Sequence, residues 1–214
     1  MESGGEGRSG VLSSILTRER ALLMAGVLVM EMVIFFGAMV VPVSQSTQQA
    51  LKDAAKHLQN ATAGASPLDT LEVIFFNNVR LALAEMVPVL GAIVFFVSIT
   101  TTGQVIQVVA TSYGAPGPLV GGLLFVFPFT MVELSAYALA VGSGSMLLVA
   151  WRRRILHGEV KVFALEAVGV VLVLLAAAAM ETAALISPSL GLALWLPTAL
   201  LIGWLAVRLG RPRR

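Results

Sequence analysis

Acidic side chains interrupt several of the longest apolar stretches of this sequence. Glu31 and Glu85 each lie near the middle of such a stretch, and Glu133 lies within the apolar run 119–150. Arg80 is the only basic residue at a comparable position. A charged group at the centre of a bilayer costs roughly 3 kcal/mol on insertion scales, so such residues usually face the interior of a helix bundle. These carboxyl groups could therefore bind a proton, a cation or a polar headgroup.

Four polar residues of the second apolar stretch fall on one side of a helix: Asn77, Asn78, Arg80 and Glu85. At 100° per residue, Asn78 and Glu85 nearly eclipse each other, and Arg80 lies about 60° from Asn77. An arc of this kind must face protein or water and not lipid. One interpretation is a polar pathway, and its residues would be Glu133, Glu85, Arg80, Asn77, Asn78 and Glu31. The other is that neutral Glu and Asn side chains hydrogen-bond between helices and fix their packing.

The balance of charge keeps the first interpretation open. Arg80 can neutralise one carboxylate, and Glu31, Glu85 and Glu133 make three. Carboxyl groups without a base must be protonated, paired through water or bound to an external cation, because burial disfavours the charged form. Glu181 lies nearer the end of its apolar stretch and is expected to reach the headgroups.

No pattern in the sequence indicates an enzyme. The chain has no cysteine, and its two histidines, His57 and His157, are predicted in loops on opposite sides of a membrane. HExxH, GxSxG, Walker A and EF-hand patterns are all absent. A net charge of +2 is too small to indicate nucleic-acid binding. We expect no catalytic residues, no cofactor and no metal.

The composition identifies a membrane protein. Of 214 residues, 57% are hydrophobic and 12% are charged, whereas a soluble domain carries about 25% charged residues. Several apolar stretches also reach the roughly 20 residues that cross a hydrocarbon core. The sequence therefore predicts an all-α, polytopic bundle of transmembrane helices.

The apolar stretches set the predicted spans. They are 21–41, 71–100, a short or tilted crossing that includes Gln104–Tyr113 and borrows from the Thr/Gly stretch before it, 119–150, 162–186 and 190–209. Pro88 and Pro128 would then lie inside spans, where each frees a backbone carbonyl. The polar segment 44–70 separates the first two spans. Within it, a short amphipathic helix is predicted from the spacing of Leu51, Ala54, Ala55 and Leu58 behind a cap at Ser46 or Thr47.

Positive residues predict the orientation. Eleven of the fourteen Lys and Arg lie before the first span, between the fourth and fifth, or after the last: Arg8, Arg18, Arg20, Arg152, Arg153, Arg154, Lys161, Arg208, Arg211, Arg213 and Arg214. All three places should therefore be cytoplasmic, with 44–70 external. This predicts six spans with both termini inside, or five if residues 71–86 lie in the interface. We expect a disordered N-terminus at 1–19, one transmembrane domain at 20–210 and a basic tail at 211–214.

Part of the sequence resembles the stage II sporulation protein M family, small multi-spanning proteins of bacteria and archaea. The resemblance rests on Phe75-Phe76-Asn77-Asn78, on the turn Thr102-Gly103 and on Pro128-Phe129-Thr130-Met131-Val132-Glu133. Small residues follow at Ala136, Ala140 and Gly142. The family has His and Gly where this chain has Phe129 and Thr130, so a role that needs an imidazole is not carried over.

The resemblance implies a non-enzymatic membrane protein, and the sporulation members of the family look like scaffolds for a cell-wall-degrading complex. The first hypothesis is therefore a scaffold or assembly subunit in the cell membrane. It would form a homo-oligomer or bind a membrane-protein partner, with the lipid bilayer as its surroundings. The second is a transporter or permease subunit with the polar pathway described above.

Overall fold

The computed structural model describes residues 17–210, apart from the side chains of Leu58, Leu209 and Gly210. Most of the predicted disordered N-terminus and the whole basic tail at 211–214 lie outside these residues. Within the described part, every regular element is a helix. The helices are α2 (Arg18–Ala38), α3 (Gln45–Thr62), α4 (Pro67–Glu85), α5 (Leu90–Ser112), α6 (Gly117–Leu124), α7 (Pro128–Arg152), α8 (Leu156–Ile186), α9 (Pro188–Ala193) and α10 (Trp195–Gly210).

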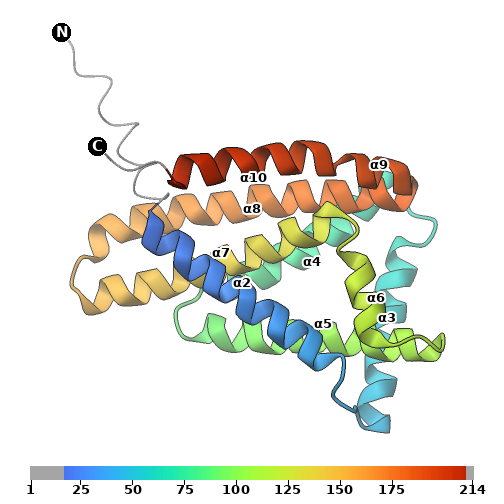
Figure 1. Cartoon of the computed structure of the whole chain (residues 1–214). Coiled ribbons are helices and arrows are strands. Elements are labelled where there is room, and N and C mark those ends of the chain that lie inside the picture. The colour runs from blue at the N-terminus through green and yellow to red at the C-terminus, as the bar shows by residue number, and fades with distance from the viewer. Residues whose placement is uncertain (1–16, 211–214) are drawn as a thin grey trace.

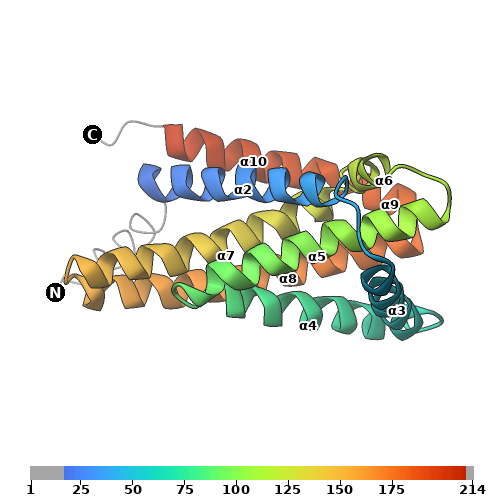
Figure 2. The same cartoon turned by 90° about the horizontal axis from the view of Figure 1, so that it is seen from below.

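The long helices form one bundle. Figure 1 and Figure 2 show α2, α4, α5, α7, α8 and α10 running roughly along one axis, while α3 lies across one end. The start of α2, the α7–α8 connection and the end of α10 lie at the opposite end, which we call the N-terminal end. The other is called the α3 end. Helices α7 and α8 form the central hairpin, with α2 on α7 and α4 on α8.

Five segments are long and apolar enough to cross a membrane: α2, α5, α7, α8 and Pro188–Arg208, which joins α9 to α10. The chain is thus an all-helical membrane protein. Helix α4 is long enough at 19 residues but is interrupted by ionisable side chains at positions 69, 72, 80 and 85. It nevertheless packs within the bundle, against α5, α7 and α8.

Local capping explains why α4 begins earlier than the apolar pattern predicted. The Ser66 hydroxyl accepts a hydrogen bond from the Asp69 backbone, and the Asp69 side chain accepts one from the Ser66 backbone. This reciprocal pair, with Pro67 at the first helical position, is a strong helix start. Helix α3 is similarly capped by Ser44 and not by the predicted Ser46 or Thr47.

The predicted boundaries of the second span are wrong. The chain turns at residues 86–89, where Val89 has a φ of 70°, and α5 then continues through Thr100–Gly103 without a break. Pro88 therefore lies in a connection between helices and not within a span. Gly103 lies within this helix, and α2 approaches so closely there that a side chain would not fit. An added Cβ would lie 2.6 Å from the Phe35 carbonyl oxygen.

The predicted span 119–150 also divides. A turn separates α6 from α7, and Pro128 is the first residue of α7. Proline is tolerated at this position because its missing N–H would have no partner in the helix. It therefore begins a helix and does not kink one. The glycines and serines at 142–145, which had looked like an interruption, are helical and buried or half-buried.

Close helix contacts at small residues generate the first testable prediction. A Cβ added at Gly144 of α7 would lie 2.5 Å from the Met86 carbonyl oxygen, whereas nothing lies within 4 Å of one added at Gly169 of α8. We expect Gly144→Ala to lower the free energy of unfolding by about 1–3 kcal/mol through overpacking. Gly169→Ala should leave it unchanged or raise it by up to about 1 kcal/mol.

Thermal unfolding of the purified protein in detergent measures both effects. Equal melting temperatures for the two variants would contradict the close contact between α7 and the α4–α5 turn.

Candidate functional site: a buried carboxyl cluster

Glu31 is the most enclosed ionisable residue of the cluster. It lies on the buried side of α2, one turn before Phe35, and its side chain is 0% exposed. Neither carboxyl oxygen has a hydrogen-bond partner among the described residues. A buried polar group without a partner is costly and therefore calls for a physical explanation.

Glu85 lies at the end of α4 and faces the interior, with 2% exposure. The Ser98 hydroxyl of α5 donates a hydrogen bond to its Oε1 at 2.8 Å. Its other oxygen, Oε2, has no partner in the described part of the chain. Because Glu85 ends its helix, the turn at 86–89 brings α5 back alongside it and supplies the serine.

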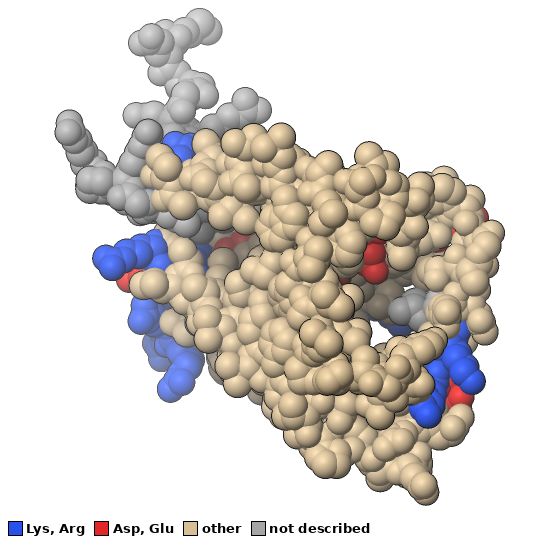
Figure 3. Space-filling view, turned by 45° about the vertical axis from the view of Figure 1, so that its right-hand side comes forward, with Lys and Arg blue, Asp and Glu red and all other residues tan. Residues whose placement is uncertain are grey.

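Glu133 comes from α7 and is less enclosed than the other two. Tyr137, one turn later on the same helix, donates a hydrogen bond to Glu133 Oε1 at 3.1 Å. The tyrosine ring is buried at 9% exposure. Figure 3 shows acidic atoms on the mostly uncharged middle of this face, between the Lys and Arg side chains at its two ends.

These three carboxyl groups form one cluster. Glu31 interacts electrostatically with both Glu85 and Glu133, although the three come from α2, α4 and α7. Glu181 of α8 is half-buried and interacts with Glu133, so it belongs to the edge of the cluster and does not simply reach outward as predicted. No group of three or more His, Cys, Asp or Glu in the described residues is arranged to hold a metal ion.

The polar arc predicted on α4 is divided between two environments. Asn78 and Glu85 face inward, at 7% and 2% exposure, whereas Arg80 is exposed on the outer side. Arg80 Nη2 donates to Asn77 Oδ1 at 2.8 Å, and Asn77 Nδ2 donates to Asn78 Oδ1 at 3.2 Å. The residues of the arc therefore do not share one environment within the bundle, because the 60° step from Asn77 to Arg80 crosses the edge of the buried face.

Arg80 was also expected to neutralise a mid-depth glutamate, and the structure assigns ion pairing to a different arginine. Arg20 of α2 is 5% exposed, and its Nη1 donates to Glu166 Oε1 at 2.7 Å. Its Nη2 donates to Glu159, also on α8. From sequence, Arg20 looked like one of several flanking positive residues. The available signal was the seven-residue spacing of Glu159 and Glu166, which puts both on one face of a helix.

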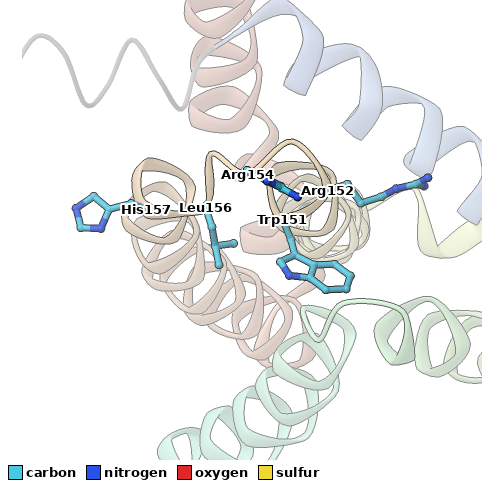
Figure 4. A pocket seen from close by; sticks show the side chains of 5 residues that line it. All are labelled: Trp151, Arg152, Arg154, Leu156 and His157. Atoms are coloured by element: carbon cyan, nitrogen blue, oxygen red, sulfur yellow. The ribbon is translucent and has the colours of Figure 1, made fainter.

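Two cavities lie away from the carboxyl cluster. One, of about 480 Å³, is at the α7–α8 connection and is lined by Trp151, Arg152, Arg154, Leu156 and His157. Figure 4 shows it as an open site, with His157 and Arg152 pointing in opposite directions. The other, of about 350 Å³, lies at the α3 end where α3, α4 and α8 meet. Neither cavity is lined by Glu31, Glu85 or Glu133.

Comparison with known proteins extends the resemblance seen at residues 75–142. The family model described as stage II sporulation protein M matches residues 24–188. The chain belongs to this family. The match covers α2 from Met24 onward and all of α3–α8, and it ends where α9 begins. The carboxyl cluster therefore lies within the family region. No curated protein and no solved structure matches the chain.

The buried ion pair between α2 and α8 generates a second prediction. Arg20→Met leaves Glu166 enclosed without its base, and removal of one partner from a buried pair costs about 3–5 kcal/mol. We therefore expect Arg20→Met to lower the melting temperature in detergent clearly. Arg18→Met is the matched control, because Arg18 is exposed on the same turn of α2.

The double variant Arg20→Met with Glu166→Gln should recover part of the lost melting temperature, since it leaves no uncompensated charge at position 166. If Arg20→Met had the same melting temperature as the wild-type protein, the ion pair would not contribute to stability.

Proposed function

We propose that this protein is a non-enzymatic assembly subunit, or scaffold, of a complex in the cell membrane. The observation that carries the proposal is the separation of the residues expected to line one polar pathway. Glu31 and Glu85 are enclosed in the core, whereas Arg80 lies on the outer surface of the bundle. A single continuous pathway would need these side chains to face the same space.

The carboxyl cluster fits a packing role. Side chains that hydrogen-bond inside a membrane bundle fix the positions of its helices, because lipid offers no competing partner. The cluster takes one carboxyl from each of α2, α4 and α7, and Ser98 connects α5 to it. It therefore lies where four helices must keep a fixed arrangement for the outer surfaces to present a constant shape.

Helix α3 supplies a surface suited to assembly. It lies across the α3 end of the bundle (Figure 2), and Leu51 is buried at 8% exposure. Asp53 and Lys56 are exposed on its other side. A helix held by one face and charged on the other is suited to bind a protein outside the bilayer.

The proposed topology has six crossings, with α4 counted in addition to the five apolar candidates. Helix α4 runs beside α8 and packs within the bundle, and its inward positions 70, 74, 78 and 82 are all buried. The arginines at the N-terminal end would then lie in the cytoplasm and α3 outside. Both termini are placed on the cytoplasmic side.

A second candidate function is proton or cation transport. It is favoured by the three carboxyl oxygens of Glu31 and Glu85 that have no partner in the described part of the chain. Ionisable residues without partners inside membrane bundles are frequent in proton relays.

A double substitution separates the two functions. An amide and a neutral acid offer similar hydrogen bonds, so Glu85→Gln with Glu133→Gln should preserve a scaffold. We expect the protein extracted from its native membrane to appear by native mass spectrometry in complexes heavier than its own 22.5 kDa, and the double variant to appear in the same complexes. Glu19→Gln, exposed in the first turn of α2, is the control.

Two results would contradict the scaffold. One is a wild-type protein that appears only as a monomer. The other is proton or cation flux into proteoliposomes that the wild type supports and the double variant abolishes.

A further inference from the structure

The outer face of α4 carries charge where lipid would be expected. Positions 68, 72, 76 and 80 recur every four residues and are all exposed, with Leu68 at 64% and Phe76 at 62%. Glu72 and Arg80 belong to the same stripe. Figure 2 shows α4 along one edge of the bundle. We call these four residues the α4 outer face.

Arg80 lies deep on this face if α4 crosses the membrane as proposed. It is thirteen residues from the start of α4 at Pro67, or about 20 Å at 1.5 Å per residue. Met86, where α4 ends, is six residues further, or about 9 Å. The hydrocarbon core is about 30 Å thick. Arg80 is therefore inside the core, while Glu72 is close to the α3 end.

The surroundings of Arg80 leave most of its hydrogen-bonding capacity unused. A guanidinium group has five N–H donors and a fixed positive charge. In the described residues its guanidinium donates only to the Asn77 side chain, one turn nearer the α3 end. The guanidinium is thus directed along the helix toward the middle of the membrane and away from the nearer interface. Both ion pairs of the described chain belong to Arg20.

A second copy of this chain does not fit the α4 outer face. In a two-fold dimer joined through this face, both copies have the same orientation in the membrane and the axis lies along its normal, so α4 would meet α4 in parallel. Arg80 would then face the partner's Arg80, and like charges repel. Glu72 is eight residues away, about 12 Å along the axis. Glu31 and Glu85 are enclosed in the core, and the half-buried Glu133 already accepts a hydrogen bond from Tyr137.

We propose that the α4 outer face binds a transmembrane helix of another membrane protein, and that this helix carries a carboxylate at the depth of Arg80. Arginine pairs with carboxylates through two parallel hydrogen bonds, which gives geometric specificity as well as energy. Phe76 supplies an apolar contact next to the pair. The inference rests on the proposed assembly function and names the chemical class of the partner.

A defined peptide tests the charge requirement. The probe is a Leu/Ala host transmembrane peptide with one Glu, moved one residue at a time through its central positions. Each peptide is co-reconstituted with the full-length protein in phosphatidylcholine nanodiscs, and association is measured by fluorescence energy transfer. We expect one optimum of depth, at which the Glu peptide binds at least about tenfold more tightly than its Gln counterpart.

Variants of the protein assign the effect to Arg80. Arg80→Met should remove the preference for Glu, and Arg80→Glu should bind a host peptide with Arg at the same depth. Arg208→Met is the control, because Arg208 lies in the last turn of α10 near the end of the bundle. Thermal unfolding of each variant shows that a lost preference is not lost folding.

Three results would overturn the proposal. Peptides with Glu, Gln and Leu could bind alike at every depth, or Arg80→Met could keep the preference for Glu. The third result would be that adding phosphatidylglycerol abolishes peptide binding to the wild type and does not change peptide binding to Arg80→Met. Arg80 would then bind the lipid headgroup and not a helix.

The peptide assay tests the α4 outer face, and the search for native complexes tests the assembly function, so either proposal can be refuted without the other. A protein that selects the Glu peptide but appears only as a monomer in its native membrane would refute the assembly function and keep the binding face. Native complexes that survive Arg80→Met, without a charge preference in the assay, would refute the binding face alone.

Discussion

A polar side chain inside a bilayer cannot turn to water, so its partner must come from the protein, and this constraint organises the bundle. Glu85 accepts from Ser98, Glu133 from Tyr137, and Glu166 from Arg20. The Glu133 contact lies within α7, whereas the other two each require a particular rotation of two helices. Together with the apolar core around Phe35 and Leu174, these two contacts help to determine which faces point inward. Glu31 is the exception, because neither of its carboxyl oxygens has a partner in the described part of the chain.

Much of the fold was predictable because hydrophobic length is a local property. The first span and the last hairpin follow directly from runs of apolar residues. The helix boundaries predicted for the central region were wrong, and the reason is physical. Gly and Thr at 100–103 look like a turn by composition, but they lie within α5, and Gly103 is the residue at which α2 approaches closely. Pro88 and Pro128 indicate a break, and sequence alone does not say whether a break bends a helix or separates two.

The candidate site was predictable in its residues and not in its pairing. Three glutamates at mid-depth were evident from their positions, and the structure brings them together from separate helices. Which arginine forms an ion pair depends on the rotation of α2 and α4, and a single sequence contains no direct record of that rotation. Arg20 is enclosed by α8, while Arg80 is one step past the buried face of α4.

The segment beyond the family region determines at which end of the bundle the described part of the chain finishes. Helix α9 packs on α8, and Trp195 at the start of α10 donates a hydrogen bond to the Val126 carbonyl, so this pair is joined to the family core at the α3 end. Without it, the chain would finish at that end, after Ile186. Helix α10 runs back along the bundle and ends near the start of α2. A domain fused after α10 would therefore lie at the opposite end of the bundle from one fused directly to α8.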